Sequence, residues 1–73
     1  MSKDTHTSAV RRIRLEKHYT MSELGYLAGV SQAFISRIEN GERSPAPAVQ
    51  VRIARALGVS LAELFPRADR RSA

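Results

Sequence analysis

The chain contains no cysteine and no tryptophan, and it has only two histidines among its 73 residues. Without cysteine there are no disulfides and no thiolate metal ligands, so a reducing compartment is compatible with the sequence. His6 and His18 are too few to form a histidine-rich metal or catalytic cluster. We therefore expect neither a metal nor any other cofactor.

Long apolar runs are also missing. No stretch approaches the about 20 apolar residues that span a bilayer, and the first eight residues hold no apolar segment typical of a secretory signal. These features predict a cytoplasmic protein with no membrane partner. The sequence shows no paired carboxylates, no nucleophile beside a base and no metal-ligand spacing, which indicates that the chain is not an enzyme.

Positive charge is in excess. Twelve Lys and Arg residues against seven Asp and Glu residues give a formal net charge of +5. Such a balance favours polyanionic partners, either nucleic acid or an anionic membrane surface. A membrane-surface helix is disfavoured because the apolar residues are spread over several short, capped segments rather than along one continuous face.

The chain divides into one domain and two tails. Residues 1–8 are polar and aperiodic and are predicted to form a flexible N-terminal tail, and residues 67–73 are predicted to form a basic C-terminal tail. Residues 9–66 are dense in helix signals and predict a single all-α domain of five short helices. These helices are expected at about 8–17, 20–29, 31–40, 47–58 and 60–66.

Start and stop signals mark the helices. Thr20 with Glu23, and Ser60 with Glu63, have the spacing of capping boxes. Ser8 and Ser31 are suitable N-caps, and Pro47 suits the first position of a helix. Glycines 29 and 58, the Asn40-Gly41 pair and Pro66 follow helix ends.

Apolar residues recur at helical spacing in each segment. Residues 49–53 alternate as in a strand, but residues 54–57 continue a helical pattern to the glycine stop, so we expect a helix there. Val30, between the second and third helices, is expected to be buried. The predicted inward residues are Val10, Ile13, Leu24, Leu27, Ala28, Ile35, Ile38, Val51, Ala54 and Leu57.

The second and third helices together predict a helix-turn-helix. The second ends at Gly29, the third restarts at Ser31, and Gly25 provides a small residue where the two helices would cross. The outward face of the third helix suits base recognition in the major groove. Glutamine can pair with adenine, arginine with guanine, and alanine can contact a thymine methyl group, whereas serine discriminates weakly. The outward residues are Gln32, Ala33, Ser36 and Arg37.

Residues 20–31 (TMSELGYLAGVS) and 34–41 (FISRIENG) resemble the phage Cro/cI-type, XRE-like helix-turn-helix family, which includes small repressors and restriction–modification controllers. Residues 54–60 (ARALGVS) and the closing Leu64-Phe65 extend the resemblance, which covers about residues 9–65. Three positions depart from the usual pattern: Met21 stands in place of glutamine, Gly25 in place of alanine and Gln50 in place of leucine.

The resemblance implies a compact five-helix, lambda-repressor-like DNA-binding domain. It implies a homodimer on a near-palindromic operator of double-stranded DNA, with the recognition helix, about 31–40, in the major groove. The four outward residues of that helix would contact bases, and Arg14 and Glu39 would form a partly buried ion pair. The implied phosphate contacts are Arg14, Thr20, Ser31, Asn40 and Arg43.

The apolar residues near the C-terminal end suggest how two subunits would meet. We expect the dimer interface to include Val59, Leu61, Leu64 and Phe65, although closure of the subunit's own core is the simpler role for these residues. The favoured function is sequence-specific transcriptional regulation as a repressor or controller. An antitoxin that binds a toxin as well as operator DNA is the alternative, and RNA polymerase is a further candidate partner.

Overall fold

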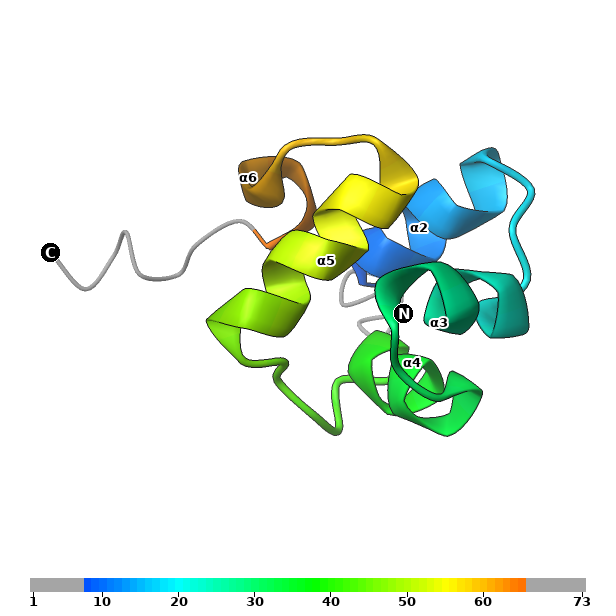
Figure 1. Ribbon diagram of the computed structural model, residues 1–73, viewed down its shortest axis with the longest axis vertical. Coiled ribbons are helices and arrows are strands. Elements are labelled where there is room, and N and C mark those ends of the chain that lie inside the picture. Colours follow the sequence, from blue (N-terminus) through cyan, green and yellow to red (C-terminus); the bar gives the residue numbers. More distant parts are fainter. Residues whose placement is uncertain (1–7, 66–73) are drawn as a thin grey trace, which may run out of the picture.

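The computed structural model describes residues 8–65, and these residues form five α-helices and no strand. Figure 1 shows the short helices crossing one another around a shared centre. The predicted all-α, five-helix fold is confirmed, whereas the predicted tails and Pro66 lie outside the described residues. The helices are α2 (Ala9–Glu16), α3 (Met21–Ala28), α4 (Gln32–Glu39), α5 (Pro47–Leu57) and α6 (Leu61–Leu64).

Local side-chain caps explain where the helices begin. Thr20 Oγ1 accepts a hydrogen bond from Glu23 N at 2.9 Å, and Glu23 Oε1 accepts one from Thr20 N at 2.8 Å. The same reciprocal pair forms between Ser60 and Glu63 at the start of α6. Each box satisfies two backbone N–H groups that the helix itself leaves unpaired. Both predicted capping boxes are therefore confirmed.

The helix ends also follow the sequence. Gly29 after α3 and Gly58 after α5 adopt left-handed backbone angles, with φ of 76° and 72°. Residues with a Cβ rarely adopt this region, so glycine is suited to both stops. Pro47 is the first residue of α5, where its missing N–H is tolerated.

The core lies between α3 and the helices around it. α3 packs against both α4 and α5, and α2 and α6 close the remaining side. Val10, Leu24, Ile35, Ile53 and Leu57 are fully buried, at 2% exposure or less. Among residues 8–65, no helix is both long enough and apolar enough to cross a bilayer.

Two predicted core positions are wrong. Leu27 is 49% exposed and Val51 is 41% exposed, whereas Val30 is half-buried and packs against the core. A helix turns by about 100° per residue, so residues at i, i+1 and i+4 lie on the same face. In these helices that face is the most buried one. In α5 the buried face is formed by Ile53, Ala54 and Leu57. Val51 therefore lies at the edge of the buried face of α5, as Leu27 does in α3.

Gln50 has a role that an apolar residue could not perform. Its side-chain Nε2 donates a hydrogen bond to the backbone oxygen of Pro45 at 3.2 Å. Pro45 is buried in the segment that leads from α4 to α5. The departure from leucine at this position therefore ties the start of α5 to its linker, because the glutamine amide satisfies a backbone acceptor there.

Candidate nucleic-acid interface

α3 and α4 form a helix-turn-helix with a turn of three residues, 29–31. The turn is closed by a hydrogen bond from Val30 N to Gly25 O at 2.9 Å. Ser31 then caps α4, because its Oγ accepts from Phe34 N at 3.0 Å. A Cβ added at Gly25 would lie only 2.7 Å from the backbone oxygen of Val30. Glycine at this position therefore permits the close approach of the turn to α3.

Replacing Gly25 by Ala is expected to lower the free energy of unfolding by about 1 kcal/mol. Helix propensity alone would favour alanine by ~1 kcal/mol. The contact with a backbone oxygen opposes this gain, since overpacking costs about 1–3 kcal/mol. Urea denaturation measures the change, with Ser22→Ala, on the exposed face of the same helix, as the control. A Gly25→Ala protein as stable as the parent would contradict this account of the crossing.

The recognition face of α4 is exposed where the sequence predicts it. Gln32, Ala33 and Arg37 are exposed, and Ser36 is half-buried. The opposite face is fixed to the protein, because Ile35 is fully buried and Ile38 is 5% exposed. Packing of the buried face therefore fixes the orientation of α4, and the helix exposes a row of polar and small side chains on its other face.

The N-termini of α3 and α4 each carry one of the predicted phosphate contacts. Thr20 and Ser31 are exposed, and each hydroxyl oxygen already accepts a backbone hydrogen bond as a cap. A hydroxyl used as an acceptor keeps its own hydrogen for donation. The helix N-termini also direct backbone N–H groups and a partial positive charge outward, which suits a phosphate.

The segment after α4 brings two further predicted residues to the surface. Asn40 and Arg43 are exposed, and Asn40 is the C-cap of α4. The guanidinium carbon of Arg43 lies 5.7 Å from the centre of the Phe34 ring. This cation–π contact connects Arg43 to α4 and favours a defined position for its charge. Phe34 itself is half-buried and packs against the core.

Arg14 and Glu39 form a buried ion pair. Arg14 Nε lies 2.6 Å from Glu39 Oε2 and Nη2 lies 3.0 Å from Glu39 Oε1, and the two side chains are 7% and 3% exposed. Arg14 Nη1 also donates to Tyr19 O at 2.8 Å. The guanidinium is therefore buried and donates at all three nitrogens, and the phosphate contact by Arg14 stays a prediction.

The pair joins three parts of the helix-turn-helix domain. Arg14 lies on α2, Glu39 is the last residue of α4, and Tyr19 precedes α3. A bidentate arginine–carboxylate pair fixes orientation as well as distance. The position of α4 relative to α2 and to the start of α3 is therefore held by directed hydrogen bonds in addition to apolar packing.

The predicted dimer residues do not all reach the surface. Leu64 is 3% exposed and belongs to the subunit's own core, whereas Leu61 is 40% exposed. Val59 and Phe65 are half-buried and pack against the core. Val51, which the sequence placed inside, adds exposed apolar surface on α5. Of the four residues predicted for the dimer interface, Leu61 is therefore the most exposed.

Sequence reasoning missed one positioning residue. Arg52 Nε donates to the backbone oxygen of Ala28 at 2.9 Å, and so satisfies a carbonyl at the C-terminal end of α3. Arginine near a helix end is a recognised partner for such carbonyls. However, Arg52 lies 24 residues away on α5. No local spacing in the sequence points to this contact.

Comparisons with known proteins agree with this geometry. A family model described as helix-turn-helix matches residues 10–64. The chain is 40% identical over 58 residues to y4dJ of Sinorhizobium fredii, an uncharacterized HTH-type transcriptional regulator, covering 80% of this chain and 75% of that protein. It is 42% identical over 60 residues to the HTH-type transcriptional repressor RghR of Bacillus subtilis, and covers 44% of that repressor's length.

Two solved structures share the fold. The restriction-modification controller protein C.AhdI of Aeromonas hydrophila superposes with a TM-score of 0.76 at 26% identity, covering 78% of this chain and 86% of that one. The clp gene regulator ClgR of Corynebacterium glutamicum gives the same TM-score and identity over 88% of this chain and 68% of that one. The fold, the helix-turn-helix and these relatives together show that the chain belongs to the XRE-like helix-turn-helix family of DNA-binding transcriptional regulators.

Proposed function

We propose that the protein regulates transcription as a repressor or controller, by placing α4 in the major groove of a specific double-stranded DNA site. The observation that carries the proposal is the exposed row of Gln32, Ala33 and Arg37 on a helix whose other face is buried. Arginine and glutamine can each form paired hydrogen bonds with one base, and alanine can contact a thymine methyl group. Ser36 would sit close to the groove floor.

Phosphate contacts would set the register of the domain on the duplex. Thr20 and Ser31 lie at the N-termini of two helices, and Asn40 and Arg43 follow α4. Contacts of this kind position a protein on DNA without reading the sequence. The proposed division is therefore base reading by α4 and anchoring by the turns around it. The proposed place of action is the cytoplasm.

We further propose a homodimer on a near-palindromic operator. Exposed Leu61 on α6 and Val51 on α5 supply apolar surface that the subunit does not bury, with half-buried Val59 and Phe65 beside the core. A two-fold pair of helix-turn-helix domains reads half-sites about one DNA turn, ~34 Å, apart. Two subunits would also double the number of phosphate contacts. Binding to a toxin or to RNA polymerase stays a prediction made from the sequence.

Replacing Leu61 by Glu is expected to shift the protein from dimer to monomer, because the substitution places a charge in the proposed apolar interface. Operator affinity should fall by about tenfold or more, since one subunit makes half the contacts. Sedimentation and gel-shift titration measure the two effects. Leu15→Glu is the matched control, because Leu15 is also an exposed leucine, on α2. An unchanged dimer would contradict the proposed interface.

Selection of bound sequences from a random DNA pool tests the function directly. The expected product is a palindrome with two half-sites about one helical turn apart. On that site, log affinity should fall with log salt with a slope of about −0.9 per phosphate contacted. Recovery of no consensus, or an affinity independent of salt, would contradict sequence-specific binding.

A further inference from the structure

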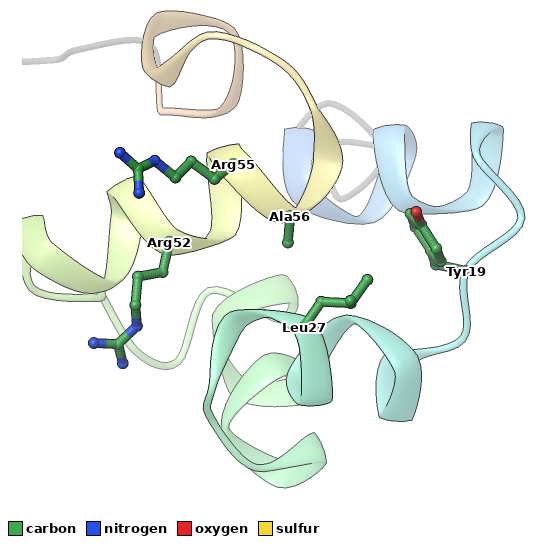
Figure 2. A pocket seen from close by; sticks show the side chains of 5 residues that line it. All are labelled: Tyr19, Leu27, Arg52, Arg55 and Ala56. Carbon is green, nitrogen blue, oxygen red and sulfur yellow. The ribbon is translucent and has the colours of Figure 1, made fainter.

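A second surface lies between α3 and α5, in two adjoining hollows that share Tyr19 and Leu27. One hollow has a volume of about 410 Å³, and Figure 2 shows Leu27 from α3 and Ala56 from α5 pointing toward each other within it. The other has a volume of about 500 Å³ and continues along the outer side of α3. The residues that line this α3–α5 groove are Tyr19, Ser22, Glu23, Tyr26, Leu27, Arg52, Arg55 and Ala56.

The floor of the α3–α5 groove is apolar and is left uncovered by the fold. Tyr26 is 86% exposed and Leu27 is 49% exposed, although both lie on a helix whose neighbours Leu24 and Ala28 are completely buried. Tyr19 and Ala56 are half-buried beside them. Apolar and aromatic side chains that gather in one exposed hollow are typical of a binding surface.

One end of the groove is cationic. Arg52 and Arg55 are exposed, and neither is paired with a carboxylate among residues 8–65. Figure 2 shows both side chains extending from α5 on the side of the groove away from Tyr19. The bond from Arg52 Nε to Ala28 O holds this guanidinium in place and leaves its two terminal amino groups available. A guanidinium that is already fixed in position loses less conformational entropy when it binds an anion.

The groove is separate from the proposed base-reading face. None of Gln32, Ala33, Ser36 and Arg37 lines it. α3 packs against both α4 and α5, and Figure 1 shows α5 above α3 and α4 below it in that view. A ligand in the groove would therefore leave the exposed side of α4 accessible to DNA.

The charge of the groove favours one kind of occupant. Residues 66–73 of this chain contain three arginines and one aspartate, so their charge has the same sign as that of Arg52 and Arg55. A DNA backbone would satisfy the arginines but would leave the apolar floor without a partner. Glu23 at the other end of the groove repels a second carboxylate there. The occupant must combine an apolar centre with an anionic group at one end.

We propose that the α3–α5 groove binds an acidic–apolar segment of a partner protein. An apolar side chain of that segment packs against Tyr19, Leu27 and Ala56, and a carboxylate next to it pairs with Arg52 or Arg55. Charge-assisted, forked hydrogen bonds from arginine supply direction, and burial of the apolar side chain supplies affinity. The regulator then holds DNA through α4 and a second protein through the α3–α5 groove.

A random peptide library displayed on phage, selected against the full-length protein, tests the proposal. Enriched peptides are expected to pair a large apolar residue with nearby Asp or Glu. Arg55→Glu and Leu27→Ser should each weaken the selected peptides by about tenfold, equivalent to about 1.4 kcal/mol. The control is Arg12→Glu, which reverses an exposed charge on α2 and should leave peptide affinity unchanged. DNA affinity should change by no more than about twofold in Leu27→Ser, and in Arg55→Glu it should fall by less than the peptide affinity does, to the same extent as in Arg12→Glu.

Five outcomes would overturn the proposal. A selection that enriches no peptide excludes an acidic–apolar partner. A selection that enriches peptides rich in Lys and Arg excludes it as well. A loss of DNA affinity in Arg55→Glu as large as the loss of peptide affinity assigns the arginines to phosphate contacts. A change of oligomeric state in Leu27→Ser assigns the groove to a second copy of the chain. Tighter peptide binding after removal of residues 66–73 assigns it to the chain's own terminus. Peptide selection uses DNA-free protein, so its result is independent of the DNA proposal.

Discussion

Replacing Glu39 by Gln is expected to lower the free energy of unfolding by about 3–5 kcal/mol, because it leaves a buried arginine without its counter-charge. Arg14 is 6% exposed, and the side chains of the pair are 7% and 3% exposed, so water replaces the lost counter-charge poorly. Domains of this size are stable by only about 5 kcal/mol or little more, so much of the protein should be unfolded at room temperature. Urea denaturation followed by circular dichroism, at a fixed protein concentration, measures the loss.

Glu42→Gln is the matched control for this substitution. Glu42 carries the same side chain three residues further on, but it is exposed and forms no ion pair within residues 8–65. Its replacement should change stability by no more than about 0.5 kcal/mol. The double substitution Arg14→Met with Glu39→Met should destabilise less than Glu39→Gln alone, because it removes both charges together. Equal effects of Glu39→Gln and Glu42→Gln would show that the pair contributes nothing to the fold.

The parts of the fold that follow from the sequence are those set by local contacts. A cap joins residues three positions apart, as Thr20 and Glu23 do, so its spacing is visible in the chain itself. The left-handed stop at Gly29 is equally local. The exposed face of α4 could also be predicted, because burying Ile35 and Ile38 forces Gln32 and Arg37 to the other side.

The parts that could not be predicted depend on contacts between distant segments. Residues 49–53 alternate, so the sequence alone does not decide whether Val51 or Ile53 faces inward, and the position of α3 decides in favour of Ile53. Arg14 and Glu39 are 25 residues apart, and only the family resemblance suggested their pairing. The α3–α5 groove could not be predicted, because the helical spacing of Leu27 places it in the core and nothing in the sequence brings Arg52 and Arg55 beside α3.

Replacing Arg37 by Ala is expected to weaken binding to the selected operator by about 1–3 kcal/mol and to relax the preference at one base position. Arg37 is exposed in the last turn of α4, on the same side of the helix as Gln32 and Ala33. Only guanine accepts a forked pair of hydrogen bonds from arginine, at O6 and N7. The loss of affinity on removal of the arginine must therefore depend on the DNA sequence. Gel-shift titration on the operator, on single-base variants and on random DNA measures the change.

Arg43→Ala separates base reading from phosphate binding in the same assay. Arg43 rests against the Phe34 ring beside α4, and its proposed contact is with phosphate. Its loss should weaken binding to operator and random DNA alike and reduce the salt slope by about 1. The two variants should therefore differ in kind, since only Arg37→Ala changes the ratio of specific to nonspecific affinity. If Arg37→Ala also weakens both DNAs equally, Arg37 contacts the backbone, and base reading by α4 must rest on Gln32, Ala33 and Ser36.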